Sequence, residues 1–370
     1  MDNWKSHIAR VSNFLHEYFL WVLLASYAVA AIFPAFGLWI RNISLGEYVF
    51  FQEDTKITLP MLMLALLLLN AGLGVKTTQL RYMLRSPLPL LVGLVANLVI
   101  PIGFIFVVAH GMRFWHNPDE VQNILVGLAL IASMPIAGSS TAWAQNANGD
   151  LALSLGLVLL STILSPLTTS ISLRAVGLMA KGEYAQQLQT LAAYGTGVFL
   201  IICVLAPSLL GILLNLVMGP SRINSVNPEL KLFNSINLLL LSYSNASVSL
   251  PQTIANPDWD FLGVTLAIVM SLCLLTFTSG WLIARLLKTD LAQQAALMFG
   301  LGMNNNGTGL VLASMTLAAH PRVMLPIIFY NLAQHLVAGV VGFITHRRGA
   351  NQEVGSMQGE WRDAELHWRR

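Results

Sequence analysis

The most constraining feature of the sequence is a polar octet, Gly302–Gly309, between two apolar arms, Ala295–Leu301 and Leu310–Ala319. Neither arm alone can cross a hydrocarbon core of about 30 Å, which takes roughly 20 helical residues, but the two arms joined through the octet can. Glycine weakens a helix, and the three consecutive asparagines supply oxygens and amide donors. The pattern therefore predicts a membrane helix that is broken near the bilayer midplane.

Two interpretations of this break stay open. Irregular backbone at membrane depth persists only where it is buried in protein or lines a cavity, which favours a solute or ion site. Alternatively, the octet is a polar contact that joins two helices, with glycine permitting their close approach.

The composition places the chain in a membrane. Of its 370 residues, 55% are hydrophobic and 10% are charged, and the mean hydropathy is +0.66. Soluble domains carry about 25% charged residues. Cys203 and Cys273 both lie in apolar runs, which is typical of small core residues and not of a disulfide or a metal pair. We therefore predict an all-α polytopic membrane protein.

Ten apolar runs follow one another along the chain, the first from Tyr18 to Ile40. The others lie near 58–75, 87–110, 121–145, 151–173, 190–218, 232–250, 261–284, 292–319 and 323–345. These runs predict ten transmembrane helices. The predicted parts are an N-terminal segment (1–17), a first five-helix repeat (18–182), a second, inverted five-helix repeat (183–346) and a polar C-terminal tail (347–370).

The distribution of basic residues predicts the orientation. With the N-terminus inside, 14 of the 20 Lys and Arg residues fall in inner segments and 6 in outer ones. Basic residues are enriched in cytoplasmic segments. We expect both termini in the cytoplasm and the chain in a plasma membrane, the inner membrane in the case of a bacterium.

A second interruption occurs at the matching place in the first half. Span four is apolar from Ile124 to Met134 and then continues as Pro135-Ile136-Ala137-Gly138-Ser139-Ser140-Thr141. Proline removes a backbone donor and frees a carbonyl, and the three hydroxyls can bind polar groups. Five is an odd number, so the second set of five spans enters the membrane from the opposite side. Interrupted spans at matching positions of two inverted halves indicate a transporter binding site.

The chain resembles the bile acid:sodium symporter family at several motifs. These are Asn70-Ala71-Gly72-Leu73-Gly74, the block from Pro135 to Ser154, Ser161-Thr162 with Ser165-Pro166-Leu167, and Gly302–Gly307. The resemblance covers about residues 18–345. It implies ten helices in two inverted repeats, a panel subdomain (spans one, two, six and seven), a core subdomain and crossed broken spans four and nine. It also implies a substrate between panel and core, with two sodium ions behind the crossing.

The resemblance implies sodium ligands at positions that this sequence fills unevenly. The first ion would be held by Ser140 and Thr141, completed by Ser154 and by a position that is Val158 here. The second ion would be held by Asn97, Asn304 and the carbonyls of Leu301 and Met303. A glutamate that serves both ions in the family is Gly300 here.

These departures bear on ion binding. Hard cations need oxygen ligands, and burying an uncompensated charge costs several kcal/mol. Valine cannot coordinate, Gly300 removes the carboxylate, and no acidic residue stands within a span. We expect no cofactor and at most one weakly bound sodium ion. The alternative role of Ser140, Thr141 and Ser154 is hydrogen bonding between helices.

The predicted substrate residues are Ser139, Asn305, Asn306, Gln334 and His335. Gln334 and His335 match a His-Asn pair that lines the family's substrate cavity. His335 is also the one histidine well inside a predicted span, and ionisable groups at that depth are functional candidates. The alternative is a neutral imidazole bonded to a neighbouring hydroxyl. We expect the loss of Asn305 or Gln334 to weaken substrate binding without unfolding the protein.

The sequence thus predicts a secondary transporter, not an enzyme. It contains no HExxH, no Walker loop, no CxxC and no membrane-embedded aspartate pair. The predicted partners are a small organic anion, bile-acid-like or another carboxylate, and the lipid bilayer, with no nucleic acid; the oligomeric state is not indicated. Two alternatives stay open: a sodium-independent or proton-coupled transporter of the same fold, and a membrane solute sensor.

Overall fold

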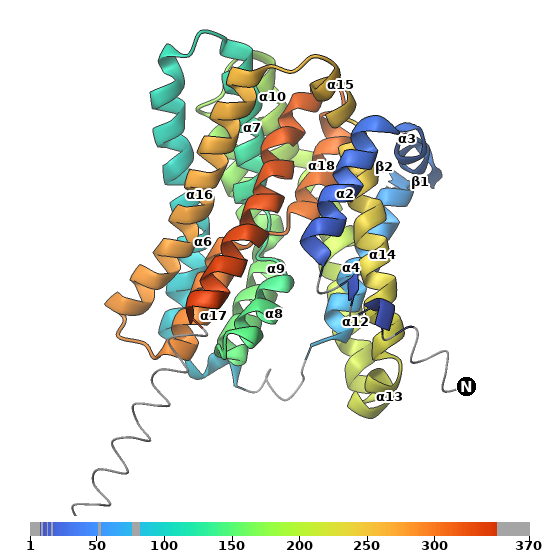
Figure 1. Cartoon of the computed structure of the whole chain (residues 1–370), viewed down its shortest axis with the longest axis vertical. Coiled ribbons are helices and arrows are strands. Elements are labelled where there is room, and N and C mark those ends of the chain that lie inside the picture. The colour runs from blue at the N-terminus through green and yellow to red at the C-terminus, as the bar shows by residue number, and fades with distance from the viewer. Residues whose placement is uncertain are drawn as a thin grey trace, which may run out of the picture.

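The computed structural model describes residues 18–50, 53–75 and 82–345, with isolated positions between 8 and 15, and its elements are mainly helices (Figure 1). The helices of the first half are α2 (Phe19–Ile32), α3 (Ala35–Asn42), α4 (Leu59–Leu73), α6 (Pro87–Gly111), α7 (Pro118–Ser133), α8 (Ser139–Asn146) and α9 (Leu151–Gly177). Those of the second half are α10 (Gly182–Thr190), α11 (Thr196–Leu200), α12 (Ala206–Met218), α13 (Pro220–Ser225), α14 (Asn227–Ala246), α15 (Leu250–Ala255), α16 (Trp259–Leu286), α17 (Leu291–Gly302) and α18 (Asn306–Thr316).

The chain then runs through η5 (Pro321–Val323) into a last helix, and we call Pro321–Thr345 the final helix. Two π-helical stretches, η3 (Leu191–Gly195) and η4 (Ile201–Leu205), join α10, α11 and α12, and short 3-10 turns η1 (Met83–Arg85) and η2 (Met112–Phe114) flank α6. The tail 347–370 and most of the segment 1–17 lie outside the described residues.

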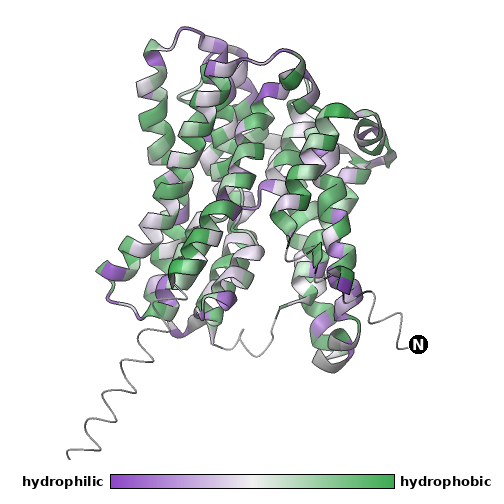
Figure 2. Cartoon of the chain, viewed as in Figure 1, coloured by the Kyte–Doolittle hydropathy of each residue, from purple (hydrophilic) through white to green (hydrophobic). Residues whose placement is uncertain are grey.

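Long apolar helices confirm a polytopic membrane protein. Within the described residues, five helices are long and apolar enough to cross a membrane, and a sixth span results if the bent pair α2 and α3 is counted as one. Hydrophobic residues follow these helices for most of their length, and hydrophilic residues gather at the loops of both ends (Figure 2). Helix length and composition alone therefore support five or six of the ten predicted spans.

The first predicted span differs from the sequence-based expectation. The apolar run Tyr18–Ile40 is not one helix, because α2 ends before Pro34 and α3 turns away from it by 92°. Proline lacks the backbone N–H that would continue the helix. After α3, the strands β1 (Ser44–Phe50) and β2 (Glu53–Thr58) form an antiparallel hairpin that was not predicted.

One group of helices, which we call the panel group, consists of α2, α3, α4, α12 and α14. In it α12 packs on α4, and α14 packs on α2, α3 and α4. The contact between α4 and α12 requires glycine: a Cβ atom at Gly72 would lie 2.2 Å from the carbonyl oxygen of Ser208, and one at Gly211 would lie 2.1 Å from that of Leu69. Small residues of this kind let membrane helices approach backbone to backbone.

Asparagines add hydrogen bonds between the panel helices. Asn70 Nδ2 on α4 donates to the carbonyl of Leu230 (3.1 Å), and Asn237 Nδ2 on α14 donates to that of Met63 (2.8 Å). Asn215 on α12 donates to the carbonyl of Val75 (3.0 Å). An amide donor that reaches a carbonyl in hydrocarbon avoids the cost of an unsatisfied polar group.

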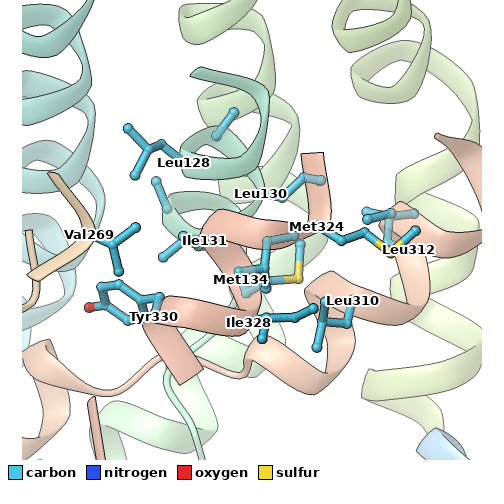
Figure 3. Close-up of a cluster of buried hydrophobic side chains, with 14 of the residues drawn as sticks. Leu128, Leu130, Ile131, Met134, Val269, Leu310, Leu312, Met324, Ile328 and Tyr330 are labelled. Atoms are coloured by element: carbon cyan, nitrogen blue, oxygen red, sulfur yellow. The ribbon is translucent and has the colours of Figure 1, made fainter. Parts of the chain in front are cut away.

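The second group, the core group, consists of α6, α7, α8, α9, α16, α17, α18 and the final helix. In it α16 packs on α17, and both α6 and α7 pack on α9. Figure 3 shows buried side chains of four of these elements in contact, among them Ile131 and Met134, Val269, Leu310, and Tyr330. This apolar cluster surrounds the segments where two helices of the core are broken.

Candidate functional site

Two helical segments of the core are interrupted, and the two interruptions meet. The chain is not helical between the end of α7 at Ser133 and the start of α8 at Ser139, nor between the end of α17 at Gly302 and the start of α18 at Asn306. Ile136 and Asn304 form an antiparallel bridge between the two breaks. The chain is thus non-helical at both predicted interruptions, and the two lie side by side at a place that we call the crossing.

Backbone hydrogen bonds hold the crossing together. The N–H of Ala137 donates to the carbonyl of Met303, and the N–H of Asn305 donates to the carbonyl of Pro135, each at 2.9 Å. The neighbouring helix α9 satisfies further groups: Ser161 Oγ accepts the N–H of Ile136 (3.1 Å), and Thr169 Oγ1 donates to the carbonyl of Ser133. The irregular backbone is therefore buried and largely bonded, as hydrocarbon requires.

The chain direction brings four helix ends to this point. The N-terminal ends of α8 and α18 and the C-terminal ends of α7 and α17 all border the crossing. A helix carries partial positive charge at its N-terminus and partial negative charge at its C-terminus. The crossing therefore presents attractive ends both to an anion and to a cation.

Five buried polar side-chain atoms at the crossing have no hydrogen-bond partner among the described residues. We call them the crossing atoms: Asn304 Oδ1, Asn306 Oδ1, Asn306 Nδ2, Thr308 Oγ1 and Ser140 Oγ. Their residues are at most 2% exposed. A buried polar group without a partner costs about 1–3 kcal/mol, so native proteins rarely keep one without a ligand, water or function to satisfy it. Several such atoms in one place indicate a site for a polar solute, an ion or ordered water.

Asn305 and Ser139 differ from the crossing atoms. Asn305 caps α18, because its Oδ1 accepts the N–H of Thr308 at 3.3 Å, and its side chain is half-buried. Ser139 is exposed at the first turn of α8. Of the predicted substrate residues, the structure thus places Asn306 inside the crossing, Asn305 at its edge and Ser139 on an accessible surface beside it.

Gln334 supports the crossing from the final helix. Its Oε1 accepts the backbone N–H of Asn304 at 3.1 Å, and its Nε2 donates to Asn331 Oδ1 at 3.4 Å. Asn331 Nδ2 in turn donates to the hydroxyl of Tyr27 on α2 at 3.0 Å. A chain of hydrogen bonds therefore links the crossing to a panel helix. Sequence reasoning missed Asn331 and Tyr27, although Asn331 lies one helical turn before Gln334 and His335, on the same face.

His335 lies at the boundary between the two helix groups, away from the crossing. Its Nδ1 is 2.7 Å from the carbonyl oxygen of Asn331, and its ring centroid is 5.7 Å from that of Phe19 on α2. The imidazole is thus bonded to backbone, not to a neighbouring hydroxyl as the alternative interpretation expected. Its position next to a panel helix suits a residue that borders the space between panel and core.

The positions that the family resemblance assigns to a first sodium ion are only partly suited to it. Ser154 Oγ donates to Thr141 Oγ1 at 3.2 Å, so these two hydroxyls do face one another. The carbonyl of Val158 already accepts the hydroxyls of Ser161 and Thr162, at 3.0 Å and 2.7 Å. The side chains that could bind this ion are therefore neutral hydroxyls, and two of these hydroxyls are already bonded to each other.

The space beside Gly300 is apolar. A Cβ atom at position 300 would lie 2.8 Å from Leu157 Cδ1, and Leu157 also approaches Gly93 on α6. Leu157 and Leu301, the residue that follows Gly300, belong to the same buried apolar cluster. Leu157 thus occupies the direction that a longer side chain at 300 would take.

The residues that the resemblance assigns to a second sodium ion lie in different surroundings. Asn97 lies one turn after Gly93, and its Oδ1 is buried without a partner in the part of the chain that the structure describes. Leu301 belongs to the apolar cluster, and the carbonyl of Met303 accepts the N–H of Ala137. No group of three or more His, Cys, Asp or Glu side chains that could hold a metal ion occurs in the described ranges. The positions assigned to the two ions thus offer a cation neutral oxygens and no carboxylate.

Long apolar helices, together with two interrupted segments that meet and carry buried polar atoms, are typical of a polytopic membrane protein of the transporter class. A family model, the Sodium Bile acid symporter family, matches residues 61–256, more than half of the chain. The chain belongs to this family of membrane transporters.

The chain is also similar to two proteins from Bacillus subtilis (strain 168). The chain is 28% identical over 277 residues to the "Uncharacterized protein YbaS", a match that covers 75% of this chain and 85% of that protein. It is 22% identical over 356 residues to the "Uncharacterized sodium-dependent transporter YocS", a match that covers 94% of this chain and 97% of that protein. The second match spans both broken helices.

Proposed function

We propose that this protein is a secondary transporter that moves a small organic anion across the membrane by alternating access, with the solute bound at the crossing. The crossing atoms that can donate a hydrogen bond to an anion carry this proposal: Asn306 Nδ2, Thr308 Oγ1 and Ser140 Oγ. Polar atoms that have no partner in an apolar interior destabilise the protein unless something binds them. Two half-helix N-termini at the same place favour a negatively charged group.

We further propose ten spans in two inverted repeats, 18–182 and 183–346. The broken segments occur at matching places of the two halves, and the panel contacts also match. In an inverted repeat α2 corresponds to the helix that ends in α12, and α4 corresponds to α14. The pairing of α2 with α14 is then equivalent to that of α12 with α4, and both pairs pack together.

The contacts suggest which parts move. The crossing is held by backbone bonds within the core group, whereas the panel group meets it through fewer polar links, such as the bond between Asn331 and Tyr27. In the proposed cycle the crossing stays intact, and the panel group shifts against it to expose the solute on alternate sides. Domain rearrangements of this type change packing at one interface while each body stays internally fixed.

Sodium coupling is proposed to be weak or absent, and a specific observation favours the sodium-independent alternative. Gly300 has no carboxylate, and the space in front of it is filled by Leu157. A cation drives transport only through a difference in affinity between two states. A site built from neutral hydroxyls, an amide oxygen and carbonyls can provide little of that difference, and holds at most one sodium ion weakly.

The proposed location is a bacterial inner membrane with both termini in the cytoplasm. The bias of basic residues supports this orientation. A cysteine scan near Lys5 and Glu360, on a background without Cys203 and Cys273, would test it with a membrane-impermeant thiol reagent. Labelling of either terminus in intact cells contradicts the orientation.

Counterflow in proteoliposomes tests the proposed function. Vesicles that contain the purified protein and an excess of one unlabelled carboxylate would be diluted into a trace of the same labelled compound, with lactate and cholate as the first two probes. Transient accumulation of label above that in protein-free vesicles is the expected result for at least one carboxylate of a wider panel. Saturable binding of a carboxylate without counterflow would identify a solute sensor instead.

A further inference from the structure

A cavity lies at the opposite end of the core from α8, away from the crossing. It is bordered by α15, by the first turn of α16 and by the start of the final helix, and its volume is about 170 Å³. Figure 1 shows α15 next to the upper ends of these helices. A cavity of about 150 Å³ holds benzene, so this one suits a solute with a few carbon atoms and not a steroid.

The cavity wall carries one positive and one negative side chain. Arg322 Nη1 lies 3.3 Å from Asp258 Oδ2, and both residues line the cavity together with the apolar Phe261 and Leu325. A guanidinium has five N–H donors, and this contact uses one of its nitrogens. The side chain of Arg322 is 43% exposed and that of Asp258 is 27% exposed, so both charges are accessible to a solute.

Ser249 gives an independent indication of a ligand. This residue is 2% exposed and lines the cavity, and its Oγ has no hydrogen-bond partner among the residues described. A buried hydroxyl in this situation is stabilised when a polar group of a bound solute reaches it.

The charges around the cavity select the class of solute. The pKa of Asp258 is raised above its usual range, first because its carboxyl shares a hydrogen bond with Asp260 and then by burial and by the negative charge of Glu120. The carboxylates of Asp258 and Asp260, of which Asp260 lies 3.2 Å from His116 Nε2, favour an ammonium group beside Asp258 over a solute that is only an anion. Arg322 repels a solute that is only a cation and offers its remaining donors to a carboxylate.

We propose that this cavity is a binding site, separate from the crossing, for a small zwitterionic solute of the size of an aliphatic α-amino acid. Its carboxylate binds Arg322, its ammonium group lies beside Asp258, Ser249 hydrogen-bonds one of its polar groups, and its apolar side chain contacts Phe261 and Leu325. Because each charge of the solute meets an opposite charge of the protein, binding buries no net charge. Because the site does not include the crossing atoms, it stands independently of the proposed transport.

Three compounds with the same branched carbon chain test this proposal by calorimetric titration of the full-length protein in detergent. L-valine carries both charges, 2-hydroxyisovalerate lacks the ammonium group, and isobutylamine lacks the carboxylate. We expect saturable binding of L-valine, and binding of each single-charge analogue that is weaker by about tenfold or more. Equal binding of 2-hydroxyisovalerate would show an anion site, and the absence of L-valine binding would show that there is no such site; either result overturns the proposal.

Substitutions of residues that line the cavity test whether L-valine binds there. Arg322→Gln should weaken L-valine binding by about tenfold or more, and Ser249→Ala, which leaves no partner unsatisfied, by several-fold. Arg113→Gln is the matched control, because it removes the same charge from a side chain that does not line the cavity. The affinity of this variant for L-valine should stay within about twofold of that of the wild type. Asn306→Leu should also retain the binding. L-valine affinity that is unchanged in both Arg322→Gln and Ser249→Ala would contradict the assigned site.

Discussion

The backbone N–H of Asn304 donates to Gln334 Oε1 at 3.1 Å, so a side chain of the final helix fixes the middle of the broken segment. Gln334 is 2% exposed, and its other end continues through Asn331 to Tyr27 on α2. Gln334 therefore positions the crossing, and its oxygen is not free for a solute in this conformation. The expectation that Gln334 can be removed without structural cost does not agree with this contact.

Replacing Gln334 by leucine should therefore reduce both stability and transport. The change leaves the buried N–H of Asn304 unpaired, which costs about 1–3 kcal/mol. We expect a lower melting temperature in detergent and a loss of about tenfold or more in counterflow. Gln186→Leu on α10 is the control, because Gln186 is exposed and its replacement should change neither quantity. A fully stable Gln334→Leu protein would show that the hydrogen bond does not hold the crossing.

The backbone contact between α4 and α12 should not tolerate a methyl group. Gly211→Ala places a Cβ atom 2.1 Å from the carbonyl oxygen of Leu69, and overpacking of this kind costs about 1–3 kcal/mol or more. We expect a large loss of folded protein, measured by size-exclusion chromatography. Gly103→Ala on α6 is the matched control, since a Cβ atom there meets nothing within 4 Å in the described structure. Equal yields of both variants would contradict the close approach.

Sodium should have little effect on transport by the wild-type protein. Uptake is compared in sodium and in choline buffer at fixed pH, and we expect rates within about twofold of each other, because few neutral ligands give little differential affinity. A steep sodium dependence with a Hill coefficient near two would refute this expectation. It would mean that carbonyls and Asn304 build full sites without an acid.

Restoring the carboxylate tests the role of Leu157. Gly300→Glu with Val158→Thr introduces the missing oxygens, but the new side chain meets Leu157 Cδ1. We therefore expect sodium sensitivity only when Leu157→Ala is added to these two changes. The triple variant is compared with the double variant in the same uptake assay. Equal sodium responses would show that Leu157 does not occupy the place of the carboxylate.

Local chemistry made the two breaks predictable from the sequence. Pro135 removes a backbone donor, and Asn305 caps the following helix, so both interruptions have a cause within a few residues. The same was true of Pro34, but the apolar run continues on both sides of it and hid the 92° bend. Apolarity and helix continuity are different properties, and the sequence pattern reports the first more directly.

The contacts that give the site its geometry could not be predicted. Asn331 and Tyr27 are 304 residues apart, and nothing local indicates that they bond. The absence of a carboxylate at Gly300 was visible in the sequence, but only the packing shows that Leu157 fills the space. Similarly, Asn305 and Asn306 are neighbours with the same side chain, yet one caps a helix and the other keeps its amide atoms free of partners within the described chain.

The melting temperature of Asn306→Leu, measured with and without a carboxylate that gives counterflow, tests the central claim most directly. Leucine removes two crossing atoms and leaves no described partner unsatisfied, so the variant should be as stable as the wild type or more stable, by about 1–3 kcal/mol. Its melting temperature should no longer rise when the carboxylate is added. Asn215→Leu is the control and should be less stable, because Asn215 donates to carbonyls of α4 and its following residues. An Asn306→Leu protein that loses stability but keeps the full ligand-induced shift would show that Asn306 joins helices and that the solute binds elsewhere.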